Sequence, residues 1–387
     1  MSLSRRNFVI ATSVAAGGTM VLTACSSGSS TAGKGDKSKG HGGTDKYTGS
    51  VVVGTKEDST GAAPEIPGAK KGGTIRGIAP DDFSHLDPQR IYFSWNSAVG
   101  DLFIRCLTGY KIASDGSMKL VGDLATDAGT TKDGGKTWAF TLKDGLKWED
   151  GKELTVEDVR HGIERGFASF TTEGAGYAQQ ALTGTTDFRG KYKGPFSGKH
   201  LDSVVIDKGA KSITFKLAEA RPDFNFTLAM SSYGAVPVKG DSKEKYDKDP
   251  VSCGPYRIKS HSVDKSMTLV RNEHWDPNND AIRNAYPDSI VYEFGPESLQ
   301  ATDRLIADSG DDQYAVMAYS GVPAERIQKV LTDPELKKRV QAAFLDVKDI
   351  PWSDQGMLNG FHPTDDKAYD IIRETASILH LDLKAMK

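Results

Sequence analysis

The sequence predicts a mixed α/β fold, because strand-like and helix-like patterns follow one another along the chain. Residues 133–165 give the clearest case. Within them, Trp138, Phe140 and Leu142 alternate with polar or small residues, which is the period of a half-buried strand. An apolar helical pattern follows soon after, so both kinds of element belong to one short segment.

Two turns and a helix complete this segment. Gly145 and Gly151 each follow an Asp, and glycine readily adopts the positive φ that tight turns require. Thr155 precedes the helical pattern, with Asp158 three residues later as its capping-box partner. We therefore expect a strand, a turn, a second strand, a turn, and a helix that ends near Arg165.

Composition and charge exclude several functions. The chain has 387 residues and a net charge of −3, which does not suggest a nucleic-acid partner. The part beyond residue 71 is long enough for a large core and two lobes. Metal-ligand spacing and a nucleophile elbow are both missing from the sequence, and His161 fits the surface of a helix. We thus expect no catalytic residue, no metal and no cofactor.

The N-terminus has the pattern of an export signal. Arg5 and Arg6 precede an uncharged stretch and resemble a twin-arginine signal. The stretch is too short and too rich in small residues for a membrane span, and it ends in Leu22-Thr23-Ala24-Cys25, which resembles a lipobox. This resemblance implies a signal peptide over residues 1–24 and lipid on Cys25. The alternative is an ordinary secretory signal that contains a cysteine.

A lipidated Cys25 would place the protein on the outer face of the cell membrane, on the periplasmic side where two membranes are present. Residues 25–70 are rich in Gly, Ser, Thr and Lys, so they predict a flexible tether rather than a packed domain. A chain of about 45 such residues spans roughly 35–40 Å.

The segment with the alternating aromatics also carries a longer motif. Trp138 to Val159 reads W-x-F-x-L-x-D-G-x-K-W-x-D-G-x-x-x-T-x-E-D-V. This resembles the signature of the extracytoplasmic solute-binding proteins of family 5, the peptide/nickel-binding lipoproteins of ABC importers. Leu86-Asp87-Pro88, Cys253-Gly254-Pro255-Tyr256 and the residues 269–275 resemble further motifs of that family.

The remaining expected elements follow in chain order. They are a strand at 71–78, a helix at 95–107, strands at 203–207 and 212–217, a helix from 221 to about 233, strands at 253–258 and 269–275, and a helix at 302–307 before a strand at 313–317.

The resemblance implies a periplasmic-binding-protein-like fold of type II, with two lobes and no enzymatic activity. The first lobe would span residues 71–287 and the start of the second residues 288–343. No family motif is evident in the tail at 344–387, where a helix is expected from about 365. We therefore expect an incomplete second lobe, only partly folded beyond about Asp288.

The implied function is the substrate-binding component of an ABC importer, a monomer that passes a peptide or other small solute to permease subunits. Nickel, haem and sugars remain open as ligands. The alternative is a truncated or rearranged copy with little ligand binding, acting as a decoy or interaction lipoprotein.

The resemblance also implies ligand contacts. Ile91, Tyr92, Phe93 and Ser94 match the cleft segment after the Leu-Asp-Pro motif, and Tyr177 matches a ligand-facing tyrosine. The alternatives are a core position for the first group and a surface loop for Tyr177.

With Cys25 assigned to lipid, Cys106 and Cys253 remain. Two cysteines in an exported protein are able to form one disulfide. Two buried free thiols are the alternative.

Overall fold

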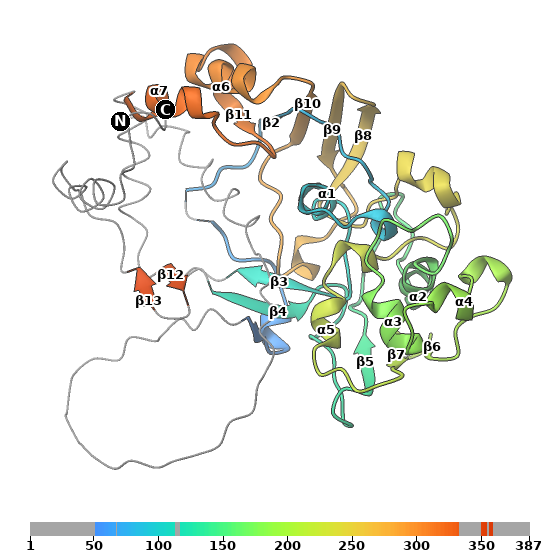
Figure 1. Ribbon diagram of the computed structural model, residues 1–387. Helices are drawn as coiled ribbons and strands as arrows, with labels where there is room; N and C mark the ends of the chain where they lie inside the picture. Colours follow the sequence, from blue (N-terminus) through green and yellow to red (C-terminus); the bar gives the residue numbers. More distant parts are fainter. Residues whose placement is uncertain (1–50, 67, 113–116, 333–349, 354–355, 359–387) are drawn as a thin grey trace, which may run out of the picture. The chain divides into compact units, whose positions relative to one another are not determined.

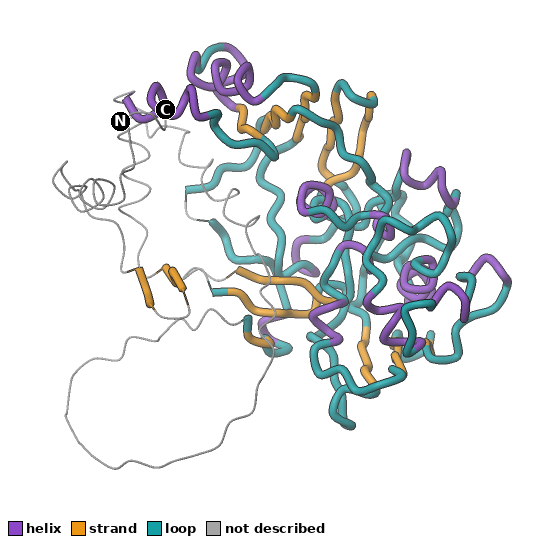
Figure 2. The backbone as a smooth tube through the Cα atoms, viewed as in Figure 1, coloured by secondary structure: helices purple, strands orange, loops and turns teal. Residues whose placement is uncertain are grey.

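The computed structural model of the chain describes residues 51–66, 68–112, 117–332, 350–353 and 356–358. The chain divides into two compact units. The described part of the first lies within residues 51–323, and that of the second comprises the helix α7 (Ala324–Thr332) and the hairpin of β12 (Ile350–Ser353) and β13 (Gly356–Leu358). Figure 2 shows that loops make up much of the first unit, between short strands and helices.

The largest sheet of the first unit has five strands and both strand directions. In spatial order it contains β11 (Ala315–Met317), β2 (Thr74–Ala79), β10 (Ser289–Phe294), β9 (Ser266–Arg271) and β8 (Tyr256–Ser262). β10 and β11 run parallel to β2, while β9 is antiparallel to both β10 and β8. The predicted mixed α/β fold is confirmed (Figure 1).

The chain continues in the same compact unit across the expected lobe boundary at residue 288. β10 pairs along its whole length with β2, from Ser289 opposite Thr74 to Phe294 opposite Ala79. α6 (Ser298–Ala307) and β11 belong to the same unit, which continues to Pro323. The chain is therefore folded well beyond Asp288, because β2 supplies partners on both of its edges for strands that sequence reasoning left unpaired.

Two smaller sheets complete the first unit. One has the order β5 (Thr137–Thr141), β7 (Ser212–Lys216), β6 (Val204–Asp207), and the other the order β1 (Val52–Val53), β4 (Met118–Gly122), β3 (Thr108–Ile112). The helix α2 (Val156–Arg165) lies against β6 and β7, beside α3 (Tyr177–Thr183) and α4 (Phe188–Lys191) (Figure 1).

The shorter elements lie between these sheets and helices. They are α1 (Ser94–Gly100), α5 (Phe224–Thr227) and the 3-10 turns η2 (Glu57–Ser59), η3 (Pro88–Arg90), η4 (Pro195–Ser197), η5 (Ser231–Tyr233), η6 (Lys243–Lys248), η7 (Pro277–Asn279) and η8 (Gly310–Tyr314). The helices expected at 95–107 and 221–233 are thus much shorter than predicted. The tail helix expected from about 365 lies outside the described residues.

The motif-bearing segment follows its prediction except in one strand. Gly145 and Gly151 have φ of 72° and 83°, and the Asp158 carboxylate accepts hydrogen bonds from the backbone N and Oγ1 of Thr155, both at 2.9 Å. The expected second strand is reduced to an isolated bridge between Lys147 and Glu153. With only this one pairing, the segment cannot form a ladder.

Cys106 and Cys253 have free thiols, so the disulfide expected between them is not formed. Cys253 packs in the core cluster around Trp138 and Phe140, and Cys106 in the cluster around Phe103 and Leu269. The Cys106 Sγ donates to the carbonyl oxygen of Met230 at 3.2 Å. Burial raises the pKa of both thiols, which keeps them protonated and unreactive.

Residues 51–66 fall within the expected tether, but they are packed as part of the first unit. β1 pairs in parallel with β4, and Ser59 is fully buried, with its Oγ accepting a hydrogen bond from Gly122 N at 2.9 Å. Ala63 N donates to the Asp280 carbonyl at 2.9 Å. Strand pairing and burial thus extend into residues that composition alone predicts to be a tether.

A buried cluster of charges lies where this segment meets β3 and β4. Arg105 Nε donates to Asp123 at 2.8 Å, and Arg283 donates to both Asp123 (2.9 Å) and Asp280 (3.2 Å). The side chains of Asp123 and Asp280 are fully buried. Burial alone would raise the pKa of Asp280, but the charges of Arg105 and Arg283 outweigh it and hold that pKa below its ordinary value.

We predict that this cluster makes stability fall in acid. A carboxylate whose pKa is depressed by folding stabilises the protein above its unfolded pKa of about 4, and this contribution is lost as the pH falls toward the folded value. Asp280→Asn should lower the free energy of unfolding at pH 7 by about 3 kcal/mol and flatten its decline between pH 4 and 2. Urea unfolding over that pH range measures both effects.

Asp264→Asn is the matched control for Asp280→Asn. Asp264 is exposed and has a φ of 57°, which asparagine also adopts readily. This variant should follow the wild-type curve. An Asp280→Asn protein with the wild-type pH dependence would contradict the prediction.

Candidate functional site

The expected cleft segment starts from a capped turn. Asp87 precedes η3 and accepts a hydrogen bond from Gln89 N at 3.1 Å. Pro88 occupies the first position of the turn, where its missing N–H costs nothing. The Leu-Asp-Pro motif therefore specifies the local shape of the chain just before residues 91–94.

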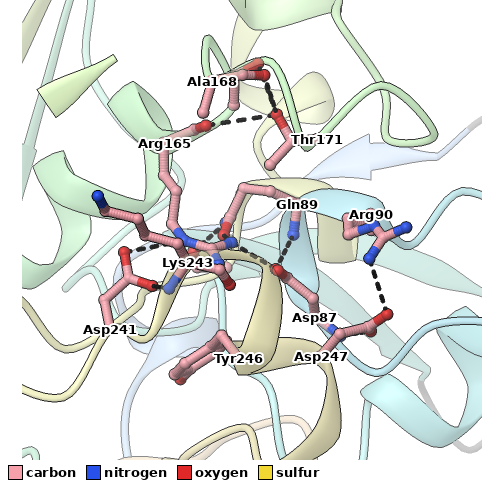
Figure 3. A network of polar contacts seen from close by, with 12 residues as sticks. Asp87, Gln89, Arg90, Arg165, Ala168, Thr171, Asp241, Lys243, Tyr246 and Asp247 are labelled. Atoms are coloured by element: carbon pink, nitrogen blue, oxygen red, sulfur yellow. Dashed lines mark hydrogen bonds and ion pairs between the residues drawn. The ribbon is translucent and has the colours of Figure 1, made fainter. Parts of the chain in front are cut away.

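A buried arginine holds this turn from a different element. Arg165 ends α2 and is fully buried. Its guanidinium donates to Asp87 at 2.6 Å, to Gln89 Oε1 at 3.0 Å and to Asp241 at 3.0 Å (Figure 3). The ring of Tyr246 lies 5.1 Å from it. Because a guanidinium has five donors in a rigid fork, one side chain can fix three partners at once.

Asp247 holds the same turn from its other side. One oxygen accepts from the backbone N of Leu86 at 2.7 Å and of Asp87 at 2.9 Å. The other oxygen accepts from Arg90 at 3.0 Å, as Figure 3 shows. Arg90 also donates to Glu173 at 3.2 Å, so the turn is tied to the segment that precedes α3.

That segment packs closely against the turn. A Cβ on Gly174 would lie 1.9 Å from the carbonyl oxygen of Gln89, so glycine is required there by the close approach. Ser232 bridges the two segments, since its Oγ donates to the carbonyl oxygen of Ile91 and accepts from Ala175 N at 3.2 Å.

The result is an exposed pair of tyrosines. The hydroxyls of Tyr92 and Tyr177 lie 2.8 Å apart, although the residues are 85 positions apart in the chain. Both rings are about half exposed, and the ring of Phe93, 64% exposed, lies 6.4 Å from that of Tyr92. Ser94 is also exposed, at the start of α1. Four of the five expected contact residues therefore present side chains to solvent from adjoining segments.

Ile91 is the exception among the five residues expected to contact ligand, because its side chain is buried. It is only 1% exposed and packs in the core with Leu86 and Phe103. The chain must bury one side chain to anchor the loop that exposes the next three. Cys25, the expected lipidation site, lies outside the described residues.

The tyrosine pair can offer a hydrogen bond to a ligand. The hydrogen bond to Tyr92, with some burial, raises the pKa of Tyr177, so the hydroxyl stays protonated at neutral pH. Two phenols carry two hydrogens, and one of these serves the bond between them. The second remains available to a carbonyl or carboxylate placed beside the rings.

Sequence reasoning did not identify the residues that position this surface. Arg165 ends a helix, where a basic residue is ordinary, and Ser232 lies in a short polar stretch. The residues next to Arg165 and Ser232 in the chain do not indicate which distant residues these two contact. Within the described residues, no group of three or more His, Cys, Asp and Glu could hold a metal ion. The helices described there are too short or too polar to cross a membrane.

Comparison with known proteins identifies the family. The sequence model of "Bacterial extracellular solute-binding proteins, family 5 Middle" matches residues 119–356, more than half of the chain. The oligopeptide-binding protein OppA of Bacillus subtilis (strain 168) is 25% identical over 221 residues, which cover 55% of this chain and 38% of OppA. A dipeptide-binding protein of Lactococcus lactis subsp. cremoris (strain MG1363) is 26% identical over 262 residues, covering 61% of this chain and 45% of the relative.

Solved structures agree with this assignment. The clavulanic acid biosynthesis oligopeptide binding protein 2 superposes with a TM-score of 0.64 at 30% identity, covering 73% of this chain and 52% of that one. The murein tripeptide binding protein MppA of Escherichia coli, at 21% identity and a TM-score of 0.56, supports the fold alone. The chain spans about half the length of these relatives or less. The chain belongs to the bacterial extracellular solute-binding proteins of family 5.

Proposed function

We propose that this chain binds peptides at the surface formed by Tyr92, Phe93, Ser94 and Tyr177, and passes them to the permease of an ABC importer. The pairing of the Tyr92 and Tyr177 hydroxyls carries the proposal, because it joins two distant segments into one exposed aromatic surface. Relatives whose names include oligopeptide- and dipeptide-binding proteins support peptides over the other solutes considered.

The chemistry of this surface suits a peptide. A peptide in extended form offers carbonyl oxygens, N–H groups and apolar side chains in alternation. The free phenol hydrogen and the Ser94 hydroxyl provide polar partners, and the rings of Tyr92, Tyr177 and Phe93 provide apolar area at a low entropic cost. The network around Arg165 holds the loop before ligand arrives, which reduces the ordering cost of binding.

The proposal includes a membrane anchor. Lipid on Cys25 would keep the binding unit near its permease, and monomeric chains would each deliver one ligand. The support comes from the order of the N-terminal residues, namely Arg5 and Arg6, the uncharged stretch and Leu22 to Cys25.

We predict that Tyr177→Ala weakens peptide binding about tenfold, because an aromatic truncation at the centre of a contact surface typically removes more than 1 kcal/mol. Isothermal titration of the full chain with a mixed tripeptide library measures the change. Phe196→Ala is the control, since Phe196 is 38% exposed and contacts His161 and Phe170 instead. Equal affinities for wild type and Tyr177→Ala would refute the proposed site. Wild-type protein that takes up no peptide would favour the decoy interpretation.

Ser232→Ala should lower the free energy of unfolding by about 1–3 kcal/mol, because it leaves the Ile91 carbonyl and the Ala175 N–H without their shared partner. Urea unfolding measures this. Ser203→Ala is the matched control, since the Ser203 Oγ is buried without a partner among the described residues, and its loss should be neutral. If the two variants are equally stable, Ser232 does not tie the segments together.

Cys25→Ser tests the anchor. We expect the variant to leave the membrane fraction or to keep its signal peptide, because serine cannot accept the thioether-linked lipid. Fractionation of expressing cells, followed by mass measurement, detects either result. A variant that stays with the membranes at the mature mass would show that Cys25 carries no anchor.

A further inference from the structure

A strained and exposed tyrosine follows the edge strand β11. Tyr319 has a φ of 64° and is 58% exposed. A bulky residue in the left-handed region is a genuine outlier, and such strain tends to persist at sites where ligands bind. A hydrogen bond of 2.8 Å from Ala318 N to the Ile78 carbonyl fixes the chain just before it.

Tyr319 is the outermost ring of an aromatic stack. Its ring lies 5.2 Å from that of Trp95, with 20° between the planes, and Trp95 lies 4.3 Å from Phe83 at 29°. Phe83 in turn meets the edges of Tyr292 and Phe294 in the sheet. The stack thus begins in the core and ends in a ring that is largely exposed to solvent.

The protein's own side chains do not complete the packing around this stack. The Nε1 of Trp95 and the Oγ of Ser320 are both buried, and none of the described residues gives them a hydrogen-bond partner. Buried polar groups normally have partners. Trp95 and Ser320 thus have hydrogen-bonding capacity beside the exposed ring that the described residues do not use.

One member of the stack, Trp95, lies close in the chain to the proposed peptide site. Trp95 follows Tyr92 by three residues, so their Cα atoms are at most about 11 Å apart. Phe93 and Ser94, both exposed, lie between them in the chain. A short peptide that contacts the Tyr92–Tyr177 pair is therefore long enough to place a side chain near Tyr319.

We propose that Tyr319 is a stacking platform for an aromatic side chain of the bound peptide, so that the chain prefers peptides with an aromatic residue. This inference rests on the proposed peptide-binding function. An aromatic ring added to the stack would bury the exposed ring and extend the offset stacking of Phe83, Trp95 and Tyr319. The alternative is that Tyr319 only shields Trp95 from water. This would explain the stacking of the two rings, but not the positive φ of Tyr319 or the exposure of its ring.

The test compares matched tripeptides on the full chain by isothermal titration. Phe-Ala-Ala, Ala-Phe-Ala and Ala-Ala-Phe are each paired with the peptide that carries leucine in place of phenylalanine. We expect at least one phenylalanine peptide to bind the wild type about threefold to tenfold more tightly than its leucine partner. Tyr319→Phe should keep this preference and Tyr319→Gly should remove it.

Tyr319→Gly is chosen because glycine adopts a positive φ without strain. Its thermal unfolding midpoint should stay near the wild-type value, whereas a purely shielding role predicts a clear drop with the peptide preference intact. Tyr314→Ala is the control, because Tyr314 is 43% exposed only five residues earlier, and this variant should keep the preference.

The outcomes separate the two proposals. Phenylalanine and leucine peptides that bind the wild type equally would overturn the role of Tyr319 and leave peptide binding intact. A preference that survives in Tyr319→Gly would also overturn it. If the wild type binds none of the six peptides, the peptide-binding function and this inference both fail.

Discussion

The buried guanidinium of Arg165 is the contact on which the site depends. It joins the end of α2 to Asp87, Gln89 and Asp241, next to the turn that precedes the exposed loop. An unpaired charge in this position would be far more costly than the paired one is stabilising. The contacts of Arg165 therefore contribute little net stability, and their main effect is to allow only one conformation of the turn.

A single arrangement of the turn matters because the exposed residues of the following loop are not held in place by packing of their own. Tyr92, Phe93 and Ser94 make few contacts with the core, so their positions follow from buried neighbours on either side. Ile91 anchors one end of the loop, and α1 begins at the other. Ser232 and Gly174 then bring the Tyr177 segment within hydrogen-bond reach. A rigid frame with an exposed aromatic surface is what a binding protein needs when the ligand must be captured without a large ordering cost.

Local sequence patterns predicted most of what depends on neighbouring residues. The alternation at Trp138 and Phe140 and the Thr155–Asp158 capping box are both present as predicted, because period and capping act within a few residues. The errors concern long-range pairing. β10 pairs with β2 just beyond the expected lobe boundary at 288, and β1 pairs with β4 within the expected tether, through backbone bonds that leave little trace in side-chain pattern.

In the candidate site, too, local features were predictable from the sequence and long-range contacts were not. The family motif indicated which loop is exposed, and the resemblance identified Tyr92 and Tyr177, but no pattern predicted that their hydroxyls would meet. Burial of Ile91 followed from three-dimensional packing alone. The charged residues that position the loop gave no local signal either, since Arg165 is fully buried and Asp247 partly buried only because distant elements close over them.

The central place of β2 has a consequence for biosynthesis. Its partner on one side begins 215 residues later, as the Thr74–Ser289 pair shows, and its other partner, β11, comes later still. At translation rates of about 5–20 residues per second, β2 waits roughly 10–40 s before either neighbour exists. High contact order of this kind slows folding and leaves a strand edge open to wrong partners. Both edges of β2 therefore stay open to wrong pairing until residues 289–317 have been made.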